Sequence, residues 1–234
     1  MSVQQRETVL ITGAAGALGT AVASAFRQRG ARLVLLDRDA GALQRRFGTV
    51  DDAVLVEVDL LDRTQVAARM ADALARVGRV HALCHIAGGF RMGEKVHETS
   101  AKTWDFLMGL NAGSLLNIAA AVVPHLVAQG GGKVVTVGAA GALKGGADMG
   151  AYAASKSALI RLTEAMSAEL RDQGINVNCV LPSIIDTPDN RAAMPDADAA
   201  RWVDPAALAD VIAFLASDAA RAIHGAAVPV TGRV

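Results

Sequence analysis

The segment TVLITGAAGALG, residues 8–19, places a glycine-rich turn between a short apolar run and the start of a helical stretch. In this context Gly13 permits a tight turn, Gly16 lets the backbone approach a pyrophosphate, and Gly19 allows the helix to pack closely on the strand. The first turn of the helix presents free N–H groups and the positive end of its dipole to phosphate. The segment therefore predicts a dinucleotide-binding loop at the start of a Rossmann fold.

The rest of the chain alternates apolar, β-branched runs with stretches of helical length that are rich in Ala, Leu, Arg and Glu. Alternation of this kind is typical of a doubly wound α/β sheet with buried parallel strands. QGGG at 129–132 is interpreted as a helix stop, because a strand and not a helix follows it. We expect a single Rossmann-type domain over residues 1–234, in which helices flank a sheet of seven parallel strands. The expected strands are 8–11, 32–36, 53–58, 81–86, 133–137, 175–181 and 226–230.

Composition excludes several classes of protein. The formal net charge is zero, and no basic stripe or aromatic platform suggests a nucleic-acid partner. The N-terminus lacks a secretory h-region, the longest apolar run (118–123) is too short to span a bilayer, and the five histidines show no metal-ligand spacing. Cys84 and Cys179 are interpreted as buried free thiols. We expect a cytoplasmic protein with a small-molecule substrate and without metal or membrane.

Two helical stretches, 111–127 and 151–170, are apolar on more than one face and rich in small residues. A helix with a wide apolar stripe must bury it on two sides, and the sheet covers only one of them. We therefore expect a homo-oligomer, dimeric or tetrameric, that forms through these helices. The alternative is a core that is entirely intramolecular.

The second strand ends at Asp37, at the spacing where a carboxylate accepts hydrogen bonds from the adenosine ribose hydroxyls and repels a 2′-phosphate. This position favours NAD over NADP as the cofactor. Arg38 keeps NADP as the alternative, because a guanidinium beside the ribose tolerates a phosphate. Asp37 is otherwise interpretable as a helix N-cap or a solvated loop acid.

Tyr152, the single tyrosine of the chain, precedes Lys156 by four residues in a helical stretch, so the two side chains share a face. An ammonium beside a phenol lowers the phenol pKa from ~10, as a general acid or base near neutral pH requires. The alternative is an ordinary surface pair.

Taken together, these motifs resemble the short-chain dehydrogenase/reductase family over nearly the whole chain. TGAAGALG is similar to TGxxxGxG, HIAG (85–88) to NNAG with both asparagines replaced, and LPSIIDT (181–187) to PGxIxT. The resemblance implies hydride transfer at nicotinamide C4, with Tyr152 exchanging the proton, Lys156 on the nicotinamide ribose and Asn111 holding a relay water. It also implies that Asp59 binds the adenine amino group. The implied cofactor-binding residues are Gly13, Ala15, Gly16, Leu18, Asp37, Arg38, Asp59, Leu60, Ala87, Gly88, Tyr152, Lys156, Pro182, Ile185 and Thr187.

Ala139 stands where the family has a serine that polarises the substrate carbonyl. Neither neighbour supplies a hydroxyl, and Thr136 is expected to point elsewhere on its strand. A ketone substrate would lose one hydrogen bond, a loss of about 3 kcal/mol of transition-state stabilisation. Either the substrate does not need the donor, or another group replaces it, or the protein binds NAD without turnover.

The stretch 186–202 resembles the DTPxNRxxMPxADxxxW run of one subgroup, the dihydropteridine reductases. That subgroup also lacks the serine and has AGG followed by an aromatic residue, as at 87–90, whereas Asn111 is similar to ordinary family members. The resemblance implies NADH-dependent reduction of a quinonoid dihydropterin, with Ala139 beside the substrate and Phe90 or Trp202 stacked on its flat ring. The alternatives are a general carbonyl or 3-oxoacyl reductase without the serine, and Trp202 as a hydrophobic anchor of the loop.

Overall fold

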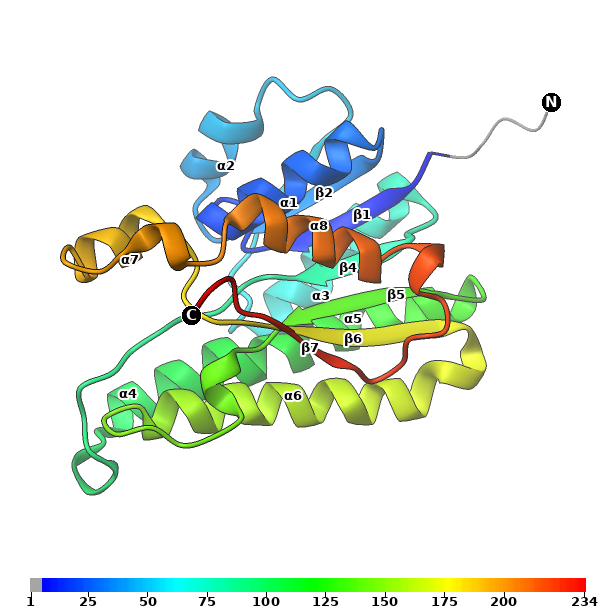
Figure 1. The fold of residues 1–234 in the computed structure, drawn as a ribbon. Coiled ribbons are helices and arrows are strands. Elements are labelled where there is room, and N and C mark those ends of the chain that lie inside the picture. The colour runs from blue at the N-terminus through cyan, green and yellow to red at the C-terminus, as the bar shows by residue number, and fades with distance from the viewer. Residues whose placement is uncertain (1–5) are drawn as a thin grey trace.

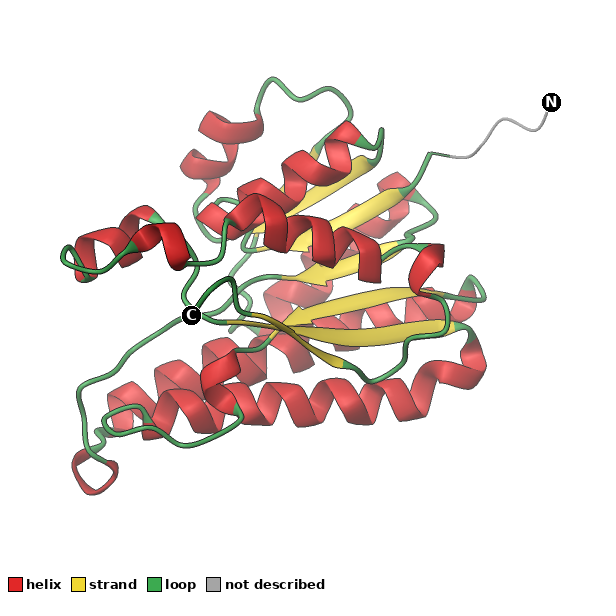
Figure 2. Cartoon of the chain, in the orientation of Figure 1, coloured by secondary structure: helices red, strands yellow, loops and turns green. Residues whose placement is uncertain are grey.

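A computed structural model describes residues 6–234 as a parallel sheet between two layers of helices (Figures 1 and 2). All seven predicted strands are confirmed, with each end within one residue of the expected position. The strands are β1 (Thr8–Thr12), β2 (Arg32–Asp37), β3 (Val54–Glu57), β4 (Ala82–His85), β5 (Gly132–Val137), β6 (Ile175–Pro182) and β7 (Ala227–Val230).

The strand order is β3-β2-β1-β4-β5-β6-β7, and every neighbouring pair is parallel. The direction of winding reverses between β1 and β4, and open α/β sheets bind ligands beyond the carboxyl ends of the strands at such a point. These ends lie on the left in Figure 1, beside α7 and the C-terminus. The segments that follow β1, β4 and β5 therefore meet at one edge of the sheet.

Each face of the sheet is covered by three helices. Val9 and Ile11 of β1 pack into the layer that contains α1 and α8, whereas Leu10 packs into the layer that contains α5 and α6. One layer holds α1 (Ala17–Gln28), α2 (Ala40–Phe47) and α8 (Pro205–Leu215), and the other α3 (Arg63–Val77), α5 (Ser114–Ala128) and α6 (Gly150–Leu170). The shorter helices are α4 (Ala101–Met108), α7 (Pro188–Ala193), η1 (Val96–Glu98), η3 (Ala140–Ala142), η4 (Arg171–Gln173), η5 (Ala199–Arg201), η6 (Asp218–Ala220) and the π-helical turn η2 (Gly109–Gly113).

Side-chain caps fix where several helices begin. Asp39, Asp62 and Ser100 each accept a hydrogen bond from a backbone N–H in the first turn of α2, α3 and α4. At α5 the predicted stop is confirmed, because Gln129 caps the helix and Gly130 has a φ of 82°.

Helices α4 and α5 and the π turn between them form one helical run, Ala101–Ala128, in which an 18-residue window has a mean hydropathy of 1.7. By length and composition alone this helix is long and apolar enough to cross a membrane. The apolar run at 118–123, on which the sequence-based expectation rested, therefore underestimates the length of the apolar helix. The run packs against α3 and α6, and buried residues such as Leu115, Ile118 and Val122 belong to the core. This packing identifies it as a core helix of the α/β fold.

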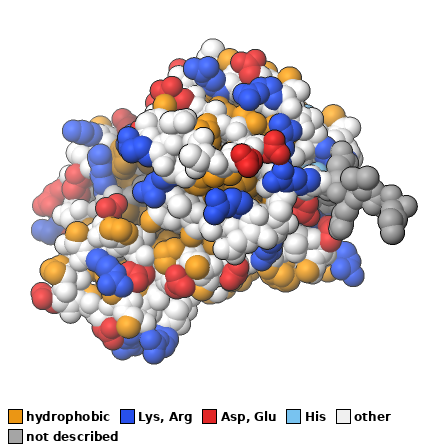
Figure 3. All heavy atoms as spheres, turned by 90° about the horizontal axis from the view of Figure 1, so that it is seen from above, with side chains coloured by type: hydrophobic (Ala, Val, Ile, Leu, Met, Phe, Trp, Pro, Cys, Tyr) orange, Lys and Arg blue, Asp and Glu red, His pale blue; other side chains and the backbone are white. Residues whose placement is uncertain are grey.

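Charged residues intermingle on the surface. Figure 3 shows acidic and basic side chains interspersed over the face seen from above, without a field of one sign. Cys84 and Cys179 are buried and free, as predicted. Within residues 6–234, no group of three His, Cys, Asp or Glu side chains is arranged to hold a metal ion.

Candidate active site

The glycine-rich loop between β1 and α1 owes its path to missing side chains. Gly13 has a φ of +63°, and a Cβ there would lie 2.9 Å from the Cα of Ala87. A Cβ on Gly19 would lie 2.7 Å from the Cα of Ala14, so the close packing of helix on strand is as predicted. Gly16 is the N-cap of α1 and supplies no side-chain cap. The loop thus fits a dinucleotide, with the N–H groups of the first turn of α1 directed to its phosphates.

At the end of β2, Asp37 braces this loop. Its Oδ2 accepts from the N–H of Ala15 at 3.0 Å, and its Oδ1 accepts from the N–H of Asp39 at 3.2 Å. The N-cap of α2 is Asp39, which rules out that alternative for Asp37. Arg38 is exposed beside it. The half-buried Asp37 carboxylate is therefore held beside the glycine-rich loop, and its predicted contact with the adenosine ribose stays a prediction.

Of the other predicted cofactor residues, Asp59 and Leu60 follow β3 and Leu18 lies in α1. Asp59 is exposed, and its Oδ1 accepts from the N–H of Leu61 at 2.9 Å. Leu60 is buried, and its carbonyl accepts from Asn117 Nδ2 at 2.8 Å. Leu18 lies in the core on the α1 side of the sheet. Of these predicted residues, Asp59 presents its side chain to the surface, whereas Leu18 and Leu60 are buried in the core.

Tyr152 and Lys156 both lie on α6, and their environments differ. Burial raises the pKa of Tyr152 to about 12, and burial lowers the pKa of Lys156 to about 8. Lys156 Nζ donates to the carbonyl of Val137 at 2.8 Å. The expectation that Lys156 lowers the Tyr152 pKa is not met in this structure, because desolvation of the phenol governs the shift.

Asn111 lies in the π turn and is fully buried. Its Oδ1 accepts from the N–H of Gly89 at 2.8 Å, and its Nδ2 donates to Gly89 O at 3.0 Å and to Ser155 Oγ at 2.9 Å. Ser155 Oγ in turn donates to the carbonyl of Tyr152 at 2.8 Å. The amide thus ties the segment after β4 to the helix that carries Tyr152, and its predicted hold on a relay water stays a prediction.

Sequence reasoning missed Ser155. The available signal was a hydroxyl residue directly before Lys156 and three residues after Tyr152, on the helix that carries both.

Two predicted cofactor residues, Ala87 and Gly88, lie between the glycine loop and the side chains of Lys156 and Asn111. A Cβ on Gly88 would lie 2.9 Å from Lys156 Nζ and 3.0 Å from Asn111 Oδ1. Only glycine lets the backbone pass between these two polar atoms without displacing one of them.

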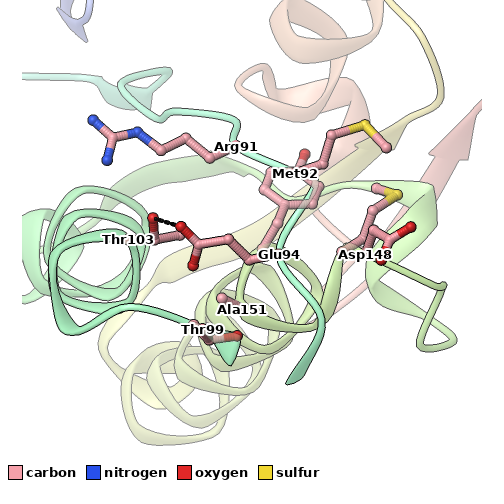
Figure 4. Close-up of a pocket in the computed structure, with 9 residues that line it drawn as sticks. Arg91, Met92, Glu94, Thr99, Thr103, Asp148 and Ala151 are labelled. Atoms are coloured by element: carbon pink, nitrogen blue, oxygen red, sulfur yellow. Dashed lines mark hydrogen bonds between the residues drawn. The ribbon is translucent and has the colours of Figure 1, made fainter. Parts of the chain in front are cut away.

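A cavity of about 180 Å³ opens beside Tyr152, between the segment after β4 and the start of α6 (Figure 4). Phe90 meets Tyr152 edge to face, with ring centroids 4.8 Å apart, and 52% of its surface is exposed. Glu94 accepts hydrogen bonds from Thr103 and Ser100, and so holds the start of α4. Besides Tyr152, Glu94 and Thr103, the residues that line the cavity are Arg91, Met92, Thr99, Asp148, Met149 and Ala151.

At the position of the missing serine, Ala139 is buried in the core cluster against which Tyr152 packs. The hydroxyl of Thr136 is hydrogen-bonded to that of Thr163 at 2.8 Å, so it points elsewhere, as predicted. At this position the segment after β5 therefore carries no side-chain donor.

The segment after β6 carries the predicted nicotinamide residues. Pro182 ends β6, Ile185 pairs with Val203, and Thr187 caps α7 by accepting from the N–H of Asn190 at 3.2 Å. Trp202 is only 8% exposed. Its burial favours the anchor interpretation over stacking on a substrate, because little of the residue is accessible.

Comparison with known proteins agrees with this geometry. The chain matches the short chain dehydrogenase family over residues 7–198. It is similar to meso-2,3-butanediol dehydrogenase of Serratia marcescens, with 32% identity over 97% of this chain and 93% of that protein. It is also similar to the 3-oxoacyl-(acyl-carrier-protein) reductase FabG of Thermotoga maritima, with 30% identity over 95% of both.

Among solved structures, the 3-ketoacyl-(acyl-carrier-protein) reductase from Brucella melitensis complexed with NADH superposes with a TM-score of 0.88. It is 28% identical, and the match covers 97% of this chain and 98% of that one. None of these three relatives is named for a pterin substrate. The chain belongs to the short-chain dehydrogenase family of NAD(P)-dependent oxidoreductases.

Proposed function

We propose that this enzyme uses NADH to reduce a small, flat, conjugated substrate, and that a quinonoid dihydropterin is the first to test. The observation that carries the proposal is Ala139, a buried alanine that brings no hydroxyl to the position where the family has its serine. Reduction of a conjugated C=N system spreads the developing charge over the ring, so a single donor matters less than for an isolated carbonyl. The exposed edge-to-face Phe90 adds an aromatic surface for a flat ring.

Bound NADH would supply the hydride from nicotinamide C4, and the side chains of this chain would supply the proton. The pKa of about 12 keeps the Tyr152 phenol protonated, which suits donation of a proton to the substrate. With a pKa of about 8, Lys156 is mostly protonated at neutral pH, so its ammonium can stabilise the phenolate that remains. Asn111 is linked through Ser155 to the carbonyl of Tyr152, and it also holds the backbone of Gly89.

The preference for NADH over NADPH rests on Asp37. Its carboxylate is held against the glycine loop, where it would repel a 2′-phosphate. No lysine or arginine pairs with it among the salt bridges of the described residues. We expect NADPH to bind at least tenfold more weakly than NADH.

The decisive experiment follows NADH oxidation with quinonoid dihydropterin generated in situ, for the wild type and for Tyr152→Phe, and repeats it with NADPH. Turnover that collapses in the variant and is weaker with NADPH would support the proposal. Turnover at the background rate would eliminate the pterin.

A second candidate is reduction of a ketone or a 3-oxoacyl group without the serine, and the names of the relatives favour it. Ala139→Ser separates the two candidates. The variant should raise ketone turnover if a carbonyl is the substrate, and should do little or cause harm if the substrate is a flat conjugated ring. Tight NADH binding without turnover of either the ketone or the pterin would instead indicate a non-catalytic NAD-binding protein.

We also propose a homo-oligomer that forms through α5 and α6. Leu116 is 50% exposed and Val127 is 37% exposed on the outer face of α5, and Ala154 is exposed on α6. Light scattering should give a dimer or tetramer for the wild type and a smaller species for Leu116→Glu. A monomeric wild type would refute this assembly.

A further inference from the structure

His85 is a buried polar residue that the proposed chemistry does not use. It ends β4, is fully buried, and stands in the HIAG segment where the family motif has an asparagine. Its Nδ1 lies 3.0 Å from Thr12 Oγ1, and its Nε2 lies 3.2 Å from Ser114 Oγ. Both ring nitrogens therefore have a hydroxyl partner, one at the end of β1 and one at the start of α5.

The directions of these hydrogen bonds follow from the partners of Thr12. Its Oγ1 accepts from the N–H groups of Ile86 at 3.0 Å and Ala87 at 3.2 Å. Two accepted bonds occupy both lone pairs, so the hydroxyl hydrogen of Thr12 is donated to His85 Nδ1. A neutral imidazole then carries its hydrogen on Nε2.

The second half of the chain of hydrogen bonds continues in the same direction. His85 Nε2 donates to Ser114 Oγ, and Ser114 Oγ donates to the carbonyl of Leu110 at 2.5 Å. Burial, with a smaller contribution from Lys156, lowers the pKa of His85 to about 3, so the imidazole stays neutral over the working range. Each polar group in this series of hydrogen bonds therefore acts either as donor or as acceptor toward the next group. Only the Nε2–H tautomer of His85 satisfies all of these bonds.

This chain joins two parts of the active site that lie far apart in the sequence. Thr12 immediately precedes Gly13 of the glycine loop, whereas Leu110 and Ser114 flank Asn111 in and after the π turn. Within the described hydrogen bonds, His85 is the link between Thr12 and Ser114.

We infer that His85 is a positioning residue that couples the dinucleotide loop to the π turn carrying Asn111, through one directed chain of hydrogen bonds. The inference rests on dinucleotide binding by the family fold and is independent of the proposed substrate. It assigns His85 no contact with the reacting atoms.

A double-mutant cycle on NADH affinity tests the coupling. Thr12→Val and Ser114→Ala break opposite ends of the chain, and each should weaken NADH binding. Because either change frees the same imidazole, the double variant should bind NADH at least about threefold more tightly than the product of the two single effects predicts. Effects that multiply to within about twofold, as expected of independent distant sites, would overturn the inference.

The controls separate coupling from loss of fold. Thr12→Ser keeps the hydroxyl and should restore near wild-type affinity. Ser157→Ala removes a hydroxyl that donates to Ala142 O at 2.7 Å and takes no part in the His85 hydrogen bonds. Its effect on NADH affinity should be independent of the effect of Thr12→Val. Thermal unfolding identifies any variant that has lost its structure.

The tautomer gives a test that needs no loop variant. In the 15N spectrum of the histidine-labelled protein, the signals that disappear in His85→Asn are those of His85. They should show the neutral Nε2–H form unchanged from pH 8 down to about pH 5. A Nδ1–H form, or a titration near pH 6.5, would overturn the inference.

Discussion

Replacing Gly88 with alanine should impair catalysis while leaving the fold intact. The added Cβ would lie 2.9 Å from Lys156 Nζ and 3.0 Å from Asn111 Oδ1. Asn111 Oδ1 is held by the N–H of Gly89 at 2.8 Å, so the flexible end of Lys156 is the group that moves. An ordinary contact of 3.4 Å requires Nζ to shift by about 0.5 Å, away from its 2.8 Å bond to Val137 O.

Displacement of a catalytic group by 1 Å costs about 10²-fold in rate, so half of that shift should lower kcat about tenfold. Steady-state NADH oxidation, with the substrate that first supports turnover, measures kcat, and thermal unfolding measures stability. Gly141→Ala is the matched control, because the nearest atom to its added Cβ is Met149 Cε at 3.9 Å. A kcat for Gly88→Ala within about twofold of this control, with the fold intact, would refute the reasoning.

Other substitutions separate structural from chemical roles. Gly19→Ala should lower the free energy of unfolding by about 1–3 kcal/mol, measured in urea, because its Cβ would lie 2.7 Å from a backbone atom; a change below about 0.5 kcal/mol would contradict this. Trp202→Ala should cost about 3–5 kcal/mol as a buried anchor, whereas Phe90→Ala, half exposed, should spare stability and reduce turnover; the reverse pattern would exchange their roles. The folded-state pKa of Lys156 is lowered to about 8, so the free energy of unfolding should rise as pH increases from 8 toward 10, and Lys156→Met should remove this rise. Above about pH 10 the raised pKa of Tyr152 acts in the opposite direction, because only the unfolded chain then ionises its phenol.

The strands were predictable because each is an apolar run whose burial the sheet requires on both faces. The helical run at 101–128 was predicted too short, starting at residue 111, for an equally physical reason. Gly109 and Gly113 have low helix propensity and suggest an interruption, but the chain accommodates them in a π turn.

The sequence predicted which residues form the candidate site, but it did not predict how deeply each side chain is buried. Spacing along the chain brought Tyr152 and Lys156 to one face, but it carried no information on desolvation, which raises one pKa and lowers the other. The burial of Trp202 was equally inaccessible, since local sequence does not show whether a loop aromatic faces the domain or the solvent. The partners of His85 lie 73 and 29 residues away, so their convergence belongs to the topology.

Two departures from the family pattern differ in kind, and the difference bears on function. Ala139 removes a donor that the nearby Thr136 does not replace, whereas His85 replaces an amide with a fully bonded imidazole. The change at Ala139 therefore falls on the substrate side, while the framework that holds the dinucleotide loop is satisfied throughout.

The buried Lys156 ammonium has a cost in stability that bears on whether the protein turns over a substrate or only binds NAD. The pKa shift from 10.5 to about 8 corresponds to an unfavourable burial of about 3 kcal/mol at neutral pH, which an apolar side chain of similar length would avoid. Lys156 lies four residues after Tyr152, and the absence of a Cβ at Gly88 leaves room for its Nζ. A role of Lys156 in proton transfer would explain why the protein retains this unfavourable burial. Lys156→Met should accordingly raise the free energy of unfolding at pH 7 and abolish turnover. A variant that is both more stable and equally active would show that the buried charge has no catalytic purpose.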